Sequence, residues 1–331
     1  MSMLTQMSQG QQSNLLIGPN GQQFTNNTNL PKELAIFAVY CSGQYDGKPT
    51  TANFISVSDF MTPMRKLIYK IQHPTSPSSD PIDVATIMKS SKGTAMHSVL
   101  EQALAWYGGY TQEVRSEKLL NGVTIHGKFD LIDNETNTIK DLKNVSNYAY
   151  KKLMDDIKLL DSLDNSLTLK ERFQVIPTYT KFQFQLSAYR WLNSNLNLNP
   201  WGDIIFSLND GGGMERYPID NFHRFPLLPY EEIEEFLIDH INELHEHLAN
   251  GTLPDCTPTE RGYSPPSFKL QRVSPTNGSM TTVRGSKFDN ESEFRAFVRK
   301  SGKPGDQEVI EPARYTLCNY CNFANICTQP I

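Results

Sequence analysis

The sequence predicts an α/β fold in which a mixed central sheet is flanked by helices, with a small C-terminal α+β unit after it. Two different spacings of apolar residues support this prediction. Over 84–107 apolar side chains recur at helical spacing, which is typical of a helix with one face on a core. Over 123–132 apolar and polar side chains alternate, which is the two-residue period of a strand. The apolar positions on the predicted buried face of the helix are Met96, Val99, Leu100, Ala103 and Leu104.

The elements that follow can be read in chain order. A turn-like run at 133–137 leads into a second strand at 138–143, which we expect to be antiparallel to the first. The polar stretch 146–172 is helix-prone and is typical of an insertion. Apolar spacing then predicts a helix at 182–192, a strand at 203–207, a Gly-rich turn at 210–213 and a long helix at 233–248 that ends near Gly251.

The two ends of the chain differ from its middle. Residues 1–31 are rich in Gln, Asn, Ser and Gly, a composition that buries too little apolar surface to offset chain entropy. Near the other end, a hairpin over 268–273 and 280–284, a helix over 290–300 and a strand near Val309 form a ββαβ unit. We therefore expect a flexible arm and lead-in at 1–50, a core at 51–252 and a C-terminal unit with a cysteine cluster at 253–331.

Charge limits how the protein meets other molecules. The net charge of -5 argues against a protein that coats nucleic acid indiscriminately. A local patch at 268–314 has nine Lys or Arg against six acids, a balance of +3, and is either a phosphate-binding face presenting Lys269, Arg272 or Arg299, or a solvated mixed surface. No secretory signal or membrane-spanning run is recognisable, so we expect a cytoplasmic protein that does not enter membranes.

The segment Ile-Lys-Asp-Leu-Lys at 139–143 carries the chemistry. Residues two apart on a strand share a face, so the Asp141 carboxylate and the Lys143 ammonium point the same way. If the preceding strand pairs with this one, Asp130 brings a second carboxylate to the same cation. Two oxygen ligands with room for water and phosphate suit Mg²⁺ or Mn²⁺.

Two helices add further polar groups. Gly93, His97 and Glu101 fall four residues apart, so they form one ridge along the helix at 84–107. Gly93 permits close approach, while His97 and Glu101 can reach the metal. Gln185 and Tyr189, one helical turn apart, present an amide and a phenol that suit a phosphate or base contact.

The order of four motifs resembles a known family. GTAMHSVLE at 93–101, GKFD at 127–130, IKDLK at 139–143 and QLSAY at 185–189 resemble the RecB-type branch of the PD-(D/E)XK nuclease superfamily, over about residues 55–250. That branch includes phage-encoded exonucleases and CRISPR-associated nucleases. The resemblance implies a PD-(D/E)XK restriction-endonuclease-like core, with metal ligands at His97, Asp130, Asp141 and the Leu142 carbonyl.

The same resemblance implies roles for the other residues. Lys143 is expected to position water or stabilise charge, Glu101 to support the site or a second metal, and Gln185 with Tyr189 to contact DNA. The implied activity is metal-dependent hydrolysis of DNA, as an exonuclease or end-processing enzyme in recombination, replication or repair. A recombinase, helicase or single-strand-binding protein is the expected partner. The alternative is a non-catalytic DNA-binding or assembly subunit that keeps the nuclease fold.

Three of the five cysteines crowd together at Cys318, Cys321 and Cys327. This spacing favours a metal site in a reducing compartment over a disulfide framework. Cys256 is our candidate for the fourth ligand of a closed site. The resemblance implies a [4Fe-4S] cluster, and structural Zn²⁺ is the alternative. Cys41 stands alone in an apolar run, where we expect a buried thiol.

Overall fold

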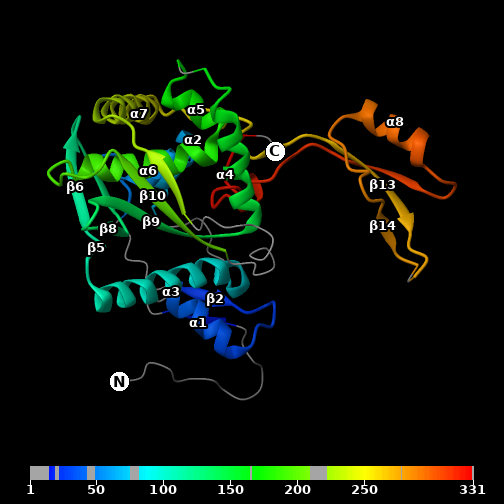
Figure 1. Ribbon diagram of the computed structural model, residues 1–331, viewed down its shortest axis with the longest axis horizontal. Helices are drawn as coiled ribbons and strands as arrows, with labels where there is room; N and C mark the ends of the chain where they lie inside the picture. The colour runs from blue at the N-terminus through cyan, green and yellow to red at the C-terminus, as the bar shows by residue number, and fades with distance from the viewer. Residues whose placement is uncertain are drawn as a thin grey trace. The chain divides into compact units, whose positions relative to one another are not determined.

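A computed structural model describes residues 15–18, 22–42, 49–74, 82–164, 166–208, 222–276 and 278–329. The chain divides into two compact units, Met1–Leu253 and Pro254–Ile331. The protein is of the mixed α/β kind that the sequence predicts, with eight α-helices and several small sheets in the described ranges (Figure 1). None of the described helices is long and apolar enough to cross a membrane.

A five-stranded mixed sheet forms the centre of the first unit, in the order β11-β10-β9-β8-β5. Strand β9 pairs parallel to β10 and antiparallel to β8, and the two edge strands are also antiparallel to their neighbours. The strands are β5 (Tyr110–Gln112), β8 (Leu131–Asp133), β9 (Thr138–Val145), β10 (Trp201–Leu208) and β11 (Phe222–Pro226). The expected strands at 138–143 and 203–207 are therefore present and somewhat longer, whereas the expected turn at 210–213 lies outside the described residues.

A second, three-stranded sheet has the order β3-β7-β6. It contains β3 (Phe54–Ser56), which the short helix η1 (Val57–Met61) follows, β6 (Arg115–Leu120) and β7 (Val123–Lys128). The single strand expected over 123–132 is wrong, because the chain bends at Phe129–Asp130 and passes from β7 in this sheet to β8 in the other. At the bend the Asp130 carboxylate accepts the Leu142 N–H at 2.8 Å, so a side chain takes a backbone donor of the neighbouring strand.

Helices cover both faces of the five-stranded sheet (Figure 1). Gly93 on α3 (Val84–Tyr107) lies against Asn144 of β9, whereas Leu186 on α6 (Pro177–Leu192) reaches the Ile139 side of the same strand. Residues 139 and 144 have opposite parity on a strand, so the two helices lie on opposite faces. Further helices lie on the α6 side: α4 (Asn147–Leu160), α5 (Leu169–Val175) and α7 (Tyr230–Asn250) contact α6, and α2 (Met64–Gln72) contacts α7.

Helix α6 lies at the centre of the core and is buried almost all round. Phe184, Leu186 and Trp191 are completely buried, and the Trp191 indole N–H donates to Glu234 of α7 at 2.8 Å. The helix begins five residues earlier than predicted, with Pro177 at its first turn, where a missing N–H costs nothing. Truncating Phe184 to Ala would cost about 3–5 kcal/mol of stability, typical for a large buried aromatic side chain.

Helix α3 has the predicted bounds, but its predicted buried face is wrong. The side chains of Met96 and Val99 are 44% and 63% exposed, and Trp106 is 87% exposed. The side with His97 and Glu101 is turned toward the strands, and of the predicted face only Leu100 and Leu104, next to this ridge, are half-buried. The other predicted core residues lie outward because the polar ridge takes the place next to the sheet.

The N-terminal part of the first unit contains more regular structure than a flexible arm. Strands β1 (Leu15–Ile17), β2 (Gln23–Thr25) and β4 (Ile82–Asp83) form a small sheet beside α1 (Lys32–Ser42). A small core of Phe24, Ala35, Ala38, Val39 and Val84 holds them together. The Cys41 thiol is buried as expected, and burial raises its pKa. Residues 1–14 lie outside the described residues.

The second unit contains the predicted ββαβ arrangement. Strands β13 (Ser267–Val273), β14 (Met280–Thr282) and β15 (Gln307–Glu311) form a sheet in the order β14-β13-β15, and α8 (Glu291–Ser301) packs on β13. Two of its expected phosphate-binding cations are already paired: Lys269 with Glu311 at 2.6 Å and Arg272 with Asp306 through two nitrogens. Further elements of this unit are β12 (Tyr263–Ser264), β16 (Arg314–Tyr315) and η2 (Cys318–Tyr320).

Candidate active site

The predicted site residues come from four elements of the first unit. The bend between β7 and β8 supplies Asp130, and β9 supplies Asp141, Leu142 and Lys143. Helix α3 supplies His97 and Glu101, and α6 supplies Gln185 and Tyr189. The structure brings these elements together around the middle of β9.

Asp130 stands between a backbone donor and an imidazole. Its Oδ2 accepts the Leu142 N–H at 2.8 Å and lies 3.6 Å from Nδ1 of His97. Burial, followed by the nearby Asp141 carboxylate, raises the pKa of Asp130 to about 8. The two carboxyl groups therefore lie close enough for Asp141 to favour the protonated form of Asp130, and the nearby Lys143 ammonium opposes that effect.

Asp141 is 2% exposed and has contacts on both of its oxygens. The Lys143 ammonium lies 2.6 Å from Oδ2, which confirms that both side chains leave β9 on the same face. Gln185 donates its amide to Oδ1 at 3.3 Å. Despite the nearby lysine, Oδ2 accepts no hydrogen bond of regular geometry from any described residue. A buried carboxylate oxygen with this capacity left over suits a cation.

His97 faces the backbone of the residue that follows Asp141. Burial lowers the pKa of His97, and a hydrogen bond with the Leu142 backbone opposes that change. The imidazole, the Leu142 backbone and the two aspartates are therefore neighbours.

Gln185 and Tyr189 lie behind Asp141. Both are buried, at 9% and 7% exposed, and the Gln185 amide also donates to the Tyr189 hydroxyl at 3.1 Å. Gly127 makes room for this phenol, because a Cβ there would lie 2.7 Å from the Tyr189 ring. The geometry supports a role in holding Asp141, and direct contact with DNA stays a prediction.

Sequence reasoning missed Glu113 and Lys128, which extend the site. The Glu113 N–H donates to the Asp130 carbonyl at 3.1 Å, and its carboxylate pairs with Lys128. Burial, then a hydrogen bond with Glu113, raises the pKa of Glu101 to about 7. Glu113 belongs to no motif; its one unusual feature is a φ of 48°, which the sequence does not reveal.

Gly93 is not needed for a close approach. A Cβ there would meet Asn144 at 3.8 Å, an ordinary van der Waals distance. When the Asn144 amide is oriented to satisfy both neighbours, it donates to the Ser207 carbonyl at 3.1 Å and accepts the Gly93 N–H at 3.3 Å. Asn144 thus joins α3 to β9 and β10, directly after Lys143.

The donor set of two carboxylates, a backbone carbonyl and one imidazole fits Mg²⁺ or Mn²⁺. As the side chains stand, no three His, Cys, Asp or Glu groups of the described ranges converge closely enough to hold a metal ion. The Lys143 ammonium provides the positive charge beside Asp141 instead. The fit of these residues to Mg²⁺ or Mn²⁺ therefore rests on the types of donor atom present and on Asp141 Oδ2, which accepts no hydrogen bond of regular geometry from a described residue.

Cys256 and the three cysteines at 318, 321 and 327 all belong to the second unit, are half-buried and form no disulfide in the described part of the chain. Gln329 donates its amide to the Cys256 carbonyl at 3.0 Å and accepts the Cys256 N–H at 2.9 Å. The distant cysteine is thereby held beside the chain that carries Cys327, two residues before Gln329. A shared metal or cluster remains a prediction.

Comparisons with known proteins add little. No protein family matches the sequence, and no curated protein matches it either. A solved structure described as "Crystal structure of SSO0001" matches with a TM-score of 0.39 and 16% identity, over 64% of this chain and 85% of that one.

Proposed function

We propose that the chain is a metal-dependent deoxyribonuclease with a RecB-type PD-(D/E)XK site. The observation that carries the proposal is the pair Asp130 and Asp141 beside Lys143, where burial and then the Asp141 carboxylate raise the pKa of Asp130 to about 8. Paired carboxylates with a perturbed pKa next to a lysine are typical of functional sites. Asp141 Oδ2 pairs with Lys143 but makes no hydrogen bond of regular geometry with the described residues, which supports the proposal that it can turn to a metal ion.

Asp130, Asp141, His97 and the Leu142 carbonyl would hold the Mg²⁺ or Mn²⁺ ion. When bound, the ion supplies an acidified water and neutralises charge on the scissile phosphate. Asp130 must lose its proton to become a ligand, so we expect metal binding to release a proton and to strengthen as the pH rises. The His97 ring, whose pKa burial lowers, is neutral and free to act as a donor ligand near pH 7.

Lys143 is the residue placed to act on the substrate. Its ammonium can orient the attacking water and stabilise the negative charge that develops on the phosphate. Gln185 and Tyr189 hold the Asp141 carboxylate in place from below. Glu101 supports the arrangement through Glu113, whose backbone holds the Asp130 carbonyl.

The wider assignment follows from this activity. We propose DNA ends as the substrate, in recombination, replication or repair in the cytoplasm, with a recombinase, helicase or single-strand-binding protein as partner. For the second unit we propose a [4Fe-4S] cluster held by Cys256, Cys318, Cys321 and Cys327, with Zn²⁺ as the alternative. The absorbance spectrum of anaerobically purified protein separates the two, since only the iron-sulfur cluster is brown.

The test of the activity is digestion of end-labelled linear and circular DNA with Mg²⁺ or Mn²⁺. Asp141→Ala and Lys143→Ala should each abolish cleavage without unfolding the protein. Asp133 and Lys140 provide a matched control, because they form an ion pair at 2.9 Å on the same two strands outside the site. Asp133→Ala and Lys140→Ala should keep the activity. Full activity in both site variants would refute the proposal, and an inert wild-type protein would favour a non-catalytic DNA-binding subunit.

A further inference from the structure

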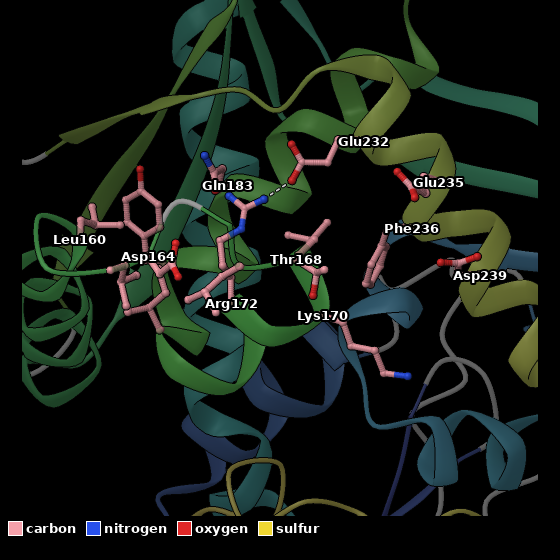
Figure 2. A pocket seen from close by; sticks show the side chains of 15 residues that line it. Leu160, Asp164, Thr168, Lys170, Arg172, Gln183, Glu232, Glu235, Phe236 and Asp239 are labelled. Atoms are coloured by element: carbon pink, nitrogen blue, oxygen red, sulfur yellow. Dashed lines mark hydrogen bonds and ion pairs between the residues drawn. The ribbon is translucent and has the colours of Figure 1, made fainter.

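A cavity of about 520 Å³ lies in the outer helical layer of the first unit, away from the candidate active site. The connection between α4 and α5 and helix α5 form one wall, and α7 forms the other, as Figure 2 shows. Gln183 of α6 contributes to the lining, whereas Gln185, two residues on, contacts Asp141. Residues two apart on a helix point in nearly opposite directions, so α6 separates the cavity from the site.

Apolar side chains line part of the cavity, and ion pairs join the two helices on either side of it. Leu160, Leu163 and Phe236 line it, and its volume is within the range of sites that bury a compact ligand or a few side chains. Arg172 of α5 reaches across to Glu232 of α7 (Figure 2), and Lys170 pairs with Glu243 of the same helix at 2.8 Å. These bridges join α5 to α7 across the cavity.

The charge that remains at the rim is negative. Lys170 and Arg172 are the two cations of the lining, and both are neutralised by the glutamates of α7. Asp164, Glu235 and Asp239 also line the cavity, are exposed, and form no ion pair with any residue that the structure describes. Such a rim repels phosphate groups and acidic peptides, and it attracts cations.

One donor at the wall is left for an occupant. The Arg172 Nε–H is buried and meets no acceptor in the described part of the chain. The Gln183 amide, by contrast, is already engaged with the Pro226 carbonyl at 2.8 Å. A buried donor without a partner is costly, and a carbonyl oxygen would satisfy it. The lining thus offers apolar surface, one hydrogen-bond donor and peripheral negative charge.

We propose that this cavity is a docking site for a short basic, amphipathic segment of a partner protein. Its apolar side chains fill the space between α5 and α7, a backbone or side-chain carbonyl meets Arg172, and its Lys or Arg residues lie against Asp164, Glu235 and Asp239. This is the arrangement in which an amphipathic segment lays its apolar face into a groove. The inference is independent of the proposed nuclease activity, because it uses none of the residues of that site.

A phage-displayed library of random dodecapeptides, panned against the intact protein, tests the inference. We expect enrichment of sequences that combine apolar residues with Lys or Arg. Glu235→Lys with Asp239→Lys should weaken a selected synthetic peptide about tenfold or more, since two attractive charges become repulsive. Glu231→Lys with Glu246→Lys, on exposed positions of the same helix outside the cavity, is the matched control and should leave its affinity unchanged.

The outcomes separate clearly. Enrichment of acidic or uncharged peptides, no enrichment, or equal affinity for both double variants would overturn the inference. Binding of a small neutral hydrophobic compound at this cavity, without peptide enrichment, would overturn it in favour of a small-molecule site. DNA cleavage by the Glu235→Lys, Asp239→Lys variant should equal that of the wild type, which keeps a failure here distinct from a failure of the proposed activity.

Discussion

Replacement of Lys143 by Met measures how strongly the buried Asp141 carboxylate depends on positive charge. The Asp141 side chain is 3% exposed and that of Lys143 is 26% exposed, with 2.6 Å between the charged atoms. After the substitution the carboxylate keeps, among the residues that the structure describes, only the Gln185 amide at 3.3 Å. Removing one partner of a buried pair costs about 3–5 kcal/mol, and the partial exposure of the lysine reduces our expectation to about 2–3 kcal/mol.

Denaturant unfolding followed by tryptophan fluorescence measures this loss. All three tryptophans lie within the first unit, and Trp191 is completely buried, so the signal reports on the unit that contains the site. Mg²⁺ or Mn²⁺ should restore more stability to the Lys143→Met variant than to the wild type, because the ion supplies the missing charge.

Lys140→Met is the control for this measurement. Its partner Asp133 also accepts the N–H groups of Glu135 and Thr136, so loss of the lysine leaves that carboxylate satisfied. We expect a loss of about 1 kcal/mol or less and no selective rescue by metal. Equal stability of the Lys143→Met variant and the wild type, or equal gains on addition of metal, would refute the reasoning.

Three further predictions concern the fold and the site. Gly127→Ala should lower the free energy of unfolding by about 1–3 kcal/mol, because its Cβ would lie 2.7 Å from the Tyr189 ring, whereas Gly93→Ala should be tolerated. Unfolding curves that rank the two variants in the other order would count against the packing described. Burial lowers the pKa of His240 to about 4, below its unfolded value near 6.5. The stability that depends on the neutral ring is therefore full above about pH 6.5 and falls toward pH 4, by about 3 kcal/mol at most. The His240→Phe variant should flatten this decline, and an unchanged pH profile would contradict the assignment. Since the pKa of Asp130 is about 8, Mn²⁺ binding near pH 7 should release a proton. Calorimetry in buffers of different ionisation enthalpy measures this release, and Asp130→Asn should remove it. Binding heats that do not depend on the buffer would argue against the assignment.

The sequence predicts most of the elements that bury one clear face. Helix α7 carries apolar residues at helical spacing and ends at Gly251, which adopts the left-handed conformation that glycine favours. The strands and helix of the second unit also match, because a hairpin turn and a capping Asn290 mark their limits. In both cases the local pattern and the tertiary packing agree.

The errors occur where polar groups determine the packing. Met96 and Val99 of α3 were expected in the core, but they are exposed because the ridge with His97 and Glu101 is turned toward the sheet. The strand through Asp130 was expected to continue, but its carboxylate binds the Leu142 N–H and the chain bends there. None of these contacts is local, so spacing along the chain does not reveal them.

The residues of the site were recognisable to different degrees. Asp141 and Lys143 follow from the two-residue period of a single strand, and the structure confirms their shared face. Glu113 joins the site through a turn with positive φ and a backbone bond to Asp130, and no motif marks it. Gln185 was identified as a site residue, yet its burial indicates that it supports Asp141.

The most direct test of the central claim is an anomalous difference map from crystals soaked with Mn²⁺. The account predicts a peak bound by carboxylate oxygens of both Asp130 and Asp141 at about 2.1 Å, with His97 and the Leu142 carbonyl beside it. A peak elsewhere in the first unit, or none at a concentration that supports DNA cleavage, would contradict it.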